Sequence, residues 1–254
     1  MQEQHIITLL PEKRFKVDAL RFKLGGKTAF FKNPEVNTYF YFTFGQIHKP
    51  ALLGMMGAVM GYRGYEVGYG EYPQYYEMLK DLRIAVIPEA EKGYFHKKIQ
   101  SFNNTVGYAS QEQGGNLIVK EQWLENPLWT VYIMMDYEIS RELADRILQH
   151  RCVYMPYLGK NDHPAVLTEA ALVRLEEADA AGDSIDRIHS LIPASAVEFD
   201  WMEGASFKYE EYLPVALKKS TNHYELQKFY FTDATVDTAE EKVFCDGERN
   251  LIFY

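Results

Sequence analysis

Basic side chains surround a glycine-rich apolar segment in the first quarter of the chain. The segment GMMGAVMG places Gly54, Gly57 and Gly61 at offsets of three and four, which is one face of a helix. The basic residues around it are Lys23, Lys27, Lys32, Lys49 and Arg63, with His48 beside Lys49. Backbone N–H groups at the start of a helix and lysine ammonium groups both bind phosphate. Two interpretations fit: a phosphate-holding surface, or glycines that let a helix pack closely on a sheet beneath solvated lysines.

A second polar cluster follows about thirty residues later, in a segment with weak alternation of apolar and polar residues. Its members are His96, Lys97, Lys98, Asn103, Asn104 and Tyr108. Lysines pair with phosphates, and Asn and Tyr bond to or stack on the splayed bases of single-stranded RNA. Lysines on an edge strand also discourage aggregation, which is the alternative. We favour contact with RNA.

Tyrosines crowd the loop between these two clusters. Tyr62, Tyr65, Tyr69, Tyr72, Tyr75 and Tyr76 alternate with glycines at 61, 64, 68 and 70. Such amphipathic rings suit base stacking, a protein interface or packing against a sheet edge. Because Glu66 and Glu71 repel phosphate, the composition favours a protein interface.

Motifs for catalysis or metal binding are absent from the sequence. It contains no Gly-x-Ser-x-Gly, no His-Glu-x-x-His and no Gly-Lys-Ser/Thr after the glycines, and the histidines have no ligand spacing. Two cysteines, Cys152 and Cys245, exclude a cysteine-based zinc site and a disulfide framework. Tyr41, His48, His96 and Lys97 carry the groups that a metal-independent ribonuclease needs, but no spacing brings them together. We therefore expect no catalytic residue, metal or cofactor.

The apolar pattern predicts an α+β fold. Strands are predicted at 15–24, 83–87, 129–135 and 153–158, and helices at 50–61, 75–82 and from an N-cap at Ser140 to about 150. Residues 38–44 fit a short strand or an extended loop, and 95–119 a protruding β-hairpin. The order βαββαβ is that of a ferredoxin-like (RRM-like) core. We divide the chain into this core, 1–160, and a smaller β-rich part, 161–254, with strands near 207, 228–232 and 251–254.

Charge is distributed unevenly along the chain. The 254 residues carry a net charge of −9 and are 47% hydrophobic, enough for a proper core. Residues 1–65 contain nine Lys or Arg against four Asp or Glu, whereas 124–254 contain 12 against 24. The basic part suits an anionic partner, and the acidic part suits solvent or a basic protein. With no secretory leader pattern and no apolar run near the about 20 residues that cross a bilayer, we expect a soluble, cytoplasmic protein.

Several motifs together resemble a known family. Three segments are similar to the N-terminal signature of the fifth CRISPR-associated (Cas) protein family: GKTAFFK at 26–32, HKPALLG at 48–54 and the glycines 57–61. Members of that family are RAMP-type subunits of the Cascade surveillance complex. Four further motifs extend the resemblance over about residues 15–160: KKIQ at 97–100, FNN at 102–104, Gly107-Tyr108 and PYLGK at 156–160. These motifs resemble those of the type I-B branch. The N-terminal motif is the most specific part.

The resemblance implies a non-catalytic subunit that caps the 5′ repeat-derived handle of crRNA and nucleates complex assembly in antiviral defence. Its neighbours would be the backbone-forming and large Cas subunits, and target DNA would be met only through the complex. One alternative is a metal-independent endoribonuclease that processes precursor crRNA, because one branch of the family does so with a Tyr, Lys and His set. A second alternative is a protein scaffold that makes no contact with RNA. The candidate RNA-binding residues are Lys23, Lys27, Lys32, His48, Lys49, Gly54, Gly57, Arg63, Lys97, Lys98, Asn103, Asn104, Tyr108 and Lys160.

Overall fold

A six-stranded sheet forms the centre of the computed structural model, which describes residues 16–35, 39–66, 68, 70–108, 111–178, 185–200 and 204–254. Its strands lie in the order β14-β13-β7-β1-β6-β3, and every neighbouring pair is antiparallel. The bounds are β1 Lys16–Gly25, β3 Ile84–Pro88, β6 Leu128–Met134, β7 Val166–Glu177, β13 Val243–Cys245 and β14 Asn250–Ile252. The α+β class predicted from the sequence is confirmed.

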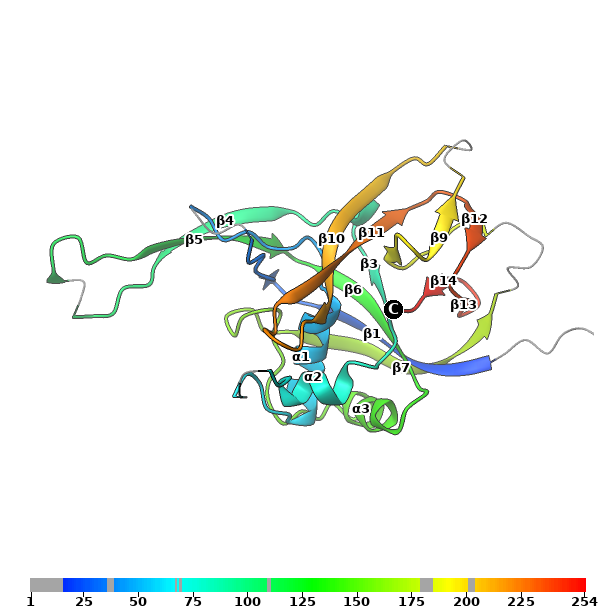
Figure 1. The fold of residues 1–254 in the computed structure, drawn as a ribbon, viewed down its shortest axis with the longest axis horizontal. Coiled ribbons are helices and arrows are strands. Elements are labelled where there is room, and N and C mark those ends of the chain that lie inside the picture. The colour runs from blue at the N-terminus through cyan, green and yellow to red at the C-terminus, as the bar shows by residue number, and fades with distance from the viewer. Residues whose placement is uncertain are drawn as a thin grey trace, which may run out of the picture.

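Alternation along β1 decides which side of the sheet meets the helices. Leu20, Phe22 and Leu24 are fully buried and belong to the same core cluster as the buried side chains of α1 (Lys49–Met60) and α3 (Glu138–Leu148). Ala19 lies on the opposite face, where a second cluster includes Phe253. Figure 1 shows the three helices, including α2 (Gln74–Leu79), gathered on one side of the sheet.

Helix α1 begins and ends where its sequence requires. The His48 imidazole accepts a hydrogen bond from the Ala51 backbone N–H, and Pro50 occupies the first turn, where its missing N–H costs nothing. Gly61 ends the helix with a φ of 84°, a conformation that glycine adopts without strain. The predicted helix over 50–61 is confirmed.

A long β-hairpin, here called the finger, projects from the body (Figure 1). It consists of β4 (Lys97–Asn103) and β5 (Ile118–Glu125), and the short β2 (Thr28–Ala29) joins it to the body by pairing with β5. This confirms the hairpin predicted over 95–119.

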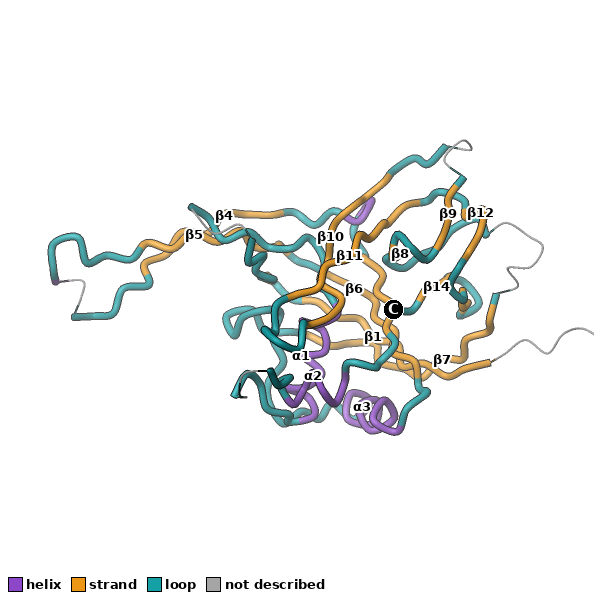
Figure 2. The backbone as a smooth tube through the Cα atoms, in the orientation of Figure 1, coloured by secondary structure: helices purple, strands orange, loops and turns teal. Residues whose placement is uncertain are grey.

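The C-terminal part is rich in strands, as predicted. Strands β10 (Lys208–Leu217), β11 (Tyr224–Thr232) and β8 (Ile192–Pro193) form one small sheet, and β9 (Val197–Phe199) pairs with β12 (Val236–Ala239). Figure 2 shows these strands beside the central sheet. A short 3-10 turn, η1 (Glu91–Gly93), precedes the finger. Division of the chain at residue 160 stays a prediction, although β7 lies beyond it and pairs with β1.

Two predicted elements differ from the structure. The predicted strand at 153–158 is wrong: this segment is a loop, tied to α1 by hydrogen bonds from Val153 N–H to Val59 O and from Tyr154 N–H to Ala58 O. The strand that pairs with β1 is β7. Ser140 is not the N-cap of α3, which begins at Glu138; its hydroxyl instead donates to the Tyr137 carbonyl from inside the first turn.

Residues 39–44 form an extended loop with isolated bridges, Lys32 to Thr43 and Tyr41 to Glu121, and residues 36–38 lie outside the described ranges. None of the helices in the described ranges has the length and apolar character to span a bilayer.

Candidate functional site

A cavity of about 780 Å³ opens beside α1, on the helix side of the sheet. One wall is α1 itself, where Pro50, Ala51, Gly54 and Ala58 present little side-chain bulk. The segment before α1, the loop after it, the loop around 154–160 and the start of β11 complete the walls. Small residues on one helix face thus leave the space that surrounding loops enclose.

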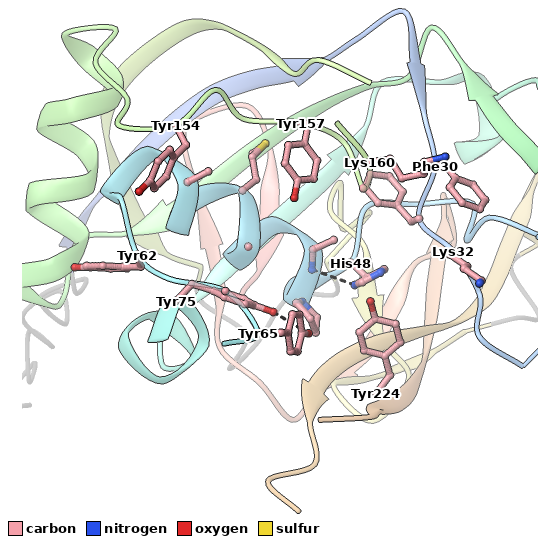
Figure 3. Close-up of a pocket in the computed structure, with 18 of the residues that line it drawn as sticks. Phe30, Lys32, His48, Tyr62, Tyr65, Tyr75, Tyr154, Tyr157, Lys160 and Tyr224 are labelled. Atoms are coloured by element: carbon pink, nitrogen blue, oxygen red, sulfur yellow. Dashed lines mark hydrogen bonds between the residues drawn. The ribbon is translucent and has the colours of Figure 1, made fainter. Parts of the chain in front are cut away.

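Aromatic rings line most of this cavity. Phe30 and Phe31 precede α1, and the tyrosines come from segments that are distant in sequence: Tyr41, Tyr62, Tyr65, Tyr75, Tyr154, Tyr157 and Tyr224. Figure 3 shows how all of these tyrosines except Tyr41 lie around the cavity. The hydroxyls of Tyr65 and Tyr75 lie 3.1 Å apart and fix each other. Burial raises the pKa of Tyr75 and raises that of Tyr224 to about 12, so both hydroxyls stay protonated. These rings therefore give flat, uncharged surfaces that can form hydrogen bonds.

His48 forms a neutral part of the cavity wall. Its ring lies edge-on to Phe31, Phe44 and Tyr224, with centroids 5.9, 5.3 and 5.0 Å away, and the residue is 2% exposed. Burial lowers the pKa of His48 to about 3. Because Nδ1 accepts from the Ala51 N–H, Nε2 carries the proton. His48 therefore offers a hydrogen-bond donor and no positive charge.

Three cations line the cavity: Lys32, Arg63 and Lys160. The Lys32 ammonium lies 4.0 Å from the centre of the Tyr41 ring. Lys160 is paired with Glu121, at 3.0 Å between Nζ and Oε1, so it neutralises a carboxylate that is 5% exposed. Glu66 also lines the cavity. Lys32 and Arg63 are thus the cations best placed to meet an anion.

The two faces of the finger carry different predicted residues. In β4, Lys97, Ile99, Ser101 and Asn103 are exposed, whereas the alternate positions are half-buried. On the half-buried face Lys98 pairs with Glu125 at 3.4 Å, and Phe102 lies under the ammonium of Lys160. Lys97 and Lys98 therefore point to opposite faces, because side chains alternate along a strand.

The other predicted finger residues lie beyond β4. The Asn103 side chain accepts a hydrogen bond from the Thr105 backbone N–H at 2.9 Å and thereby fixes the turn. The Asn104 N–H donates to the Leu117 carbonyl, and Tyr108 is 76% exposed. The side chains of Tyr108 and Asn104 are therefore both exposed to solvent or to a partner.

Several predicted residues lie away from the cavity. Lys23 points to the face of β1 opposite the helices and pairs with Glu169 at 3.4 Å. Lys27 is exposed in the turn before β2. Burial at the start of α1 lowers the pKa of Lys49 to about 8, opposed by the nearby Asp81. Lys23 and Lys49 thus do not line the cavity that Lys32, His48, Gly54, Arg63 and Lys160 share.

Gly57 is a packing residue. A Cβ atom built on it would lie 2.5 Å from the Tyr75 Cβ, whereas one on Gly54 would lie 3.7 Å from the nearest ring atom. We expect Gly57→Ala to lower the free energy of unfolding by about 1–3 kcal/mol, because α2 must shift. Gly54→Ala should raise it by about 0.5–1 kcal/mol, because alanine loses less backbone entropy in a helix. Urea unfolding of the two variants measures both, and equal effects would contradict the packing role of Gly57.

No pattern in the sequence groups Tyr154, Tyr157 and Tyr224 in one site. Tyr154 and Tyr157 are 59% and 46% exposed, within a run that also exposes Met155. That apolar run resembled a buried strand, which concealed its role as a wall. Tyr69 lies outside the described residues, and Tyr72 and Tyr76 bond to the Leu217 backbone instead.

The described residues also hold no group of three His, Cys, Asp or Glu that could bind a metal ion.

Comparison with known proteins identifies the fold. No family model matches the chain, and neither does any curated protein. A chain of a solved "CRISPR RNA-guided surveillance complex" is similar, with a TM-score of 0.52 and 12% identity over 86% of this chain and 91% of that one. A CRISPR protein from Archaeoglobus fulgidus gives 0.50 and 11% over 92% and 98%. The fold is one that CRISPR-associated proteins have, as the resemblance predicted, and the type I-B subtype stays a prediction.

Proposed function

We propose that the protein is a crRNA-binding subunit of a CRISPR effector complex, which holds the 5′ handle of the crRNA and nucleates assembly. The observation that carries this is the finger beside a cation-bearing aromatic cavity, on a fold shared along most of its length with a chain of a surveillance complex. Single-stranded RNA is held by that combination of cationic side chains and stacking rings.

The core of the protein is proposed to be ferredoxin-like. Strands β7, β1, β6 and β3 are adjacent in that order, with α1 and α2 between β1 and β3, and α3 between β6 and β7. This antiparallel βαββαβ arrangement supports the assignment. The finger would then be an insertion between the second and third core strands.

The proposed role is non-catalytic. A metal-independent ribonuclease needs a base that accepts a proton near neutral pH. His48 is buried, its Nδ1 is occupied by the Ala51 N–H, and its pKa is about 3. Tyr41 lies beneath the Lys32 ammonium rather than beside a histidine. His96 and Lys97, the other two groups that a ribonuclease would use, do not line the cavity with Tyr41 and His48. These positions support binding over cleavage. The proposed protein neighbours are the backbone-forming and large Cas subunits.

Affinity capture from native cells tests this function, with sequencing of the bound RNA and mass spectrometry of the bound protein. Short RNAs that share one repeat-derived 5′ end, together with other Cas subunits, would support it. An intact complex without such RNA would contradict it. Repeat RNA cut by the pure protein in EDTA would contradict the non-catalytic part.

We expect the double substitution Lys32→Gln and Lys97→Gln to weaken binding of handle-bearing crRNA by about ten-fold at fixed salt. Each lost phosphate contact should reduce the slope of log affinity against log salt by about 0.7. Fluorescence anisotropy at several salt concentrations measures both quantities.

Arg174→Gln/Lys242→Gln is the matched control, because it also removes two exposed cations, which pair with Asp18 and Glu177 on the central sheet. Equal loss in the control would show that net charge, and not the finger and cavity, governs binding.

A further inference from the structure

The cavity combines flat aromatic walls with a neutral histidine. Tyr62, Tyr154 and Tyr157 bring rings from two loops, and Tyr224 brings one from β11 (Figure 3). Small residues of α1 provide the floor, and His48 provides a hydrogen-bond donor. Tyrosine rings and a neutral histidine do not balance the charge of a phosphate group, which is better placed beside Lys32 or Arg63. A planar heterocycle gains ring contact and a partner for one of its acceptor atoms.

The charges fit the same ligand. Lys160 forms an ion pair with Glu121, so its charge is already balanced. Lys32 and Arg63 are the lining cations that do not pair with Glu121. Arg63 is exposed, and Lys32 is exposed above Tyr41. A nucleotide within an RNA strand matches this arrangement of neutral rings and cations. Its base is planar and uncharged, and its sugar is linked to an anionic phosphate on each side.

We propose that the cavity takes one unstacked nucleobase of single-stranded RNA, which packs against Tyr154 and Tyr157 while its flanking phosphates meet Lys32 and Arg63. The proposal rests on the proposed function and deepens it, because it names which part of the RNA this site reads. His48 donates from Nε2 to an acceptor on the edge of the base. Because burial keeps His48 neutral, its Nε2 donates this hydrogen bond at neutral pH.

The test compares four synthetic eight-nucleotide RNAs of equal charge: oligo(A), oligo(U), oligo(C) and an abasic ribose-phosphate oligomer. The full chain should bind at least one base-bearing RNA about ten-fold more tightly than the abasic one at fixed salt, which corresponds to one stacked base. In Tyr154→Ala/Tyr157→Ala that preference should shrink to about two-fold. Both side chains are about half exposed, so their removal leaves the core intact.

Tyr154→Phe/Tyr157→Phe is the conservative control and should keep the preference, because the rings remain. Equal binding of all four RNAs by the unmodified protein would overturn the base pocket and leave the RNA-binding function standing. A preference that survives the alanine variant would place base recognition elsewhere and also overturn the pocket. Binding of none of the four would overturn both proposals, and the cavity would then be open to a protein ligand.

Discussion

Replacing Gly159 with alanine is expected to lower the free energy of unfolding by about 3 kcal/mol or more. A Cβ atom at this position would lie 1.8 Å from the Phe30 carbonyl oxygen, and the backbone φ is +89°, where L side chains are strained. Phe30 has little freedom to retreat, because its N–H donates to the Leu158 carbonyl at 3.1 Å. Urea unfolding followed by circular dichroism measures the change.

Gly64→Ala is the matched control, because nothing lies within 4 Å of a Cβ built there. Its expected effect is within about 0.5 kcal/mol. Gly159 and Phe30 both line the cavity, so a folded Gly159→Ala protein should also bind RNA less tightly. A Gly159→Ala protein as stable as the Gly64→Ala protein would show that the close approach of the two segments is not required.

Acid is expected to destabilise the protein through His48. The folded-state pKa is about 3, whereas an unfolded histidine has a pKa near 6.5, so the unfolded state alone binds the proton between these values. Stability from this group is present above the unfolded pKa and is lost as pH falls toward the folded one. The loss is about 1.4 kcal/mol per pH unit, or about 2–3 kcal/mol at pH 4.5.

His48→Asn isolates this contribution, because asparagine is a good N-cap that does not titrate. The variant loses the ring contacts to Phe44 and Tyr224, and we expect it to be less stable at pH 7. Its stability should then fall less steeply than that of the unmodified protein between pH 6.5 and 4.5. Parallel curves, from urea unfolding at several pH values, would assign the acid sensitivity to other groups.

Patterns in the sequence predicted correctly those elements in which the order of apolar and polar residues alone determines which side chains are buried. The alternation in β1, the apolar run of β6 and the Pro50 start of α1 each specify one structure without help from distant residues. The segment 153–158 has the same apolar character, yet Tyr154 and Tyr157 are about half exposed. Hydrogen bonds to Val59 and Ala58, which are distant in sequence, decide its conformation.

The candidate site was harder to predict because it is assembled from distant parts of the chain. Lys32, His48 and Arg63 lie near each other in the sequence, and all three line the cavity. Lys160 and Tyr224 reach it only through the fold. Lys97 and Lys98 were grouped as neighbours, whereas the pleat of β4 directs them to opposite faces.

The exposed apolar residues of the finger bear on how this protein meets its partners. Ile99, Leu117 and Ile118 are 50%, 55% and 55% exposed, so little buried area holds the outer hairpin together. A two-stranded hairpin of this kind is marginally stable by itself. Its backbone amides therefore exchange with solvent through local openings that need far less energy than global unfolding. A ligand that rests on the finger must suppress those openings, so part of the binding free energy is consumed in ordering it.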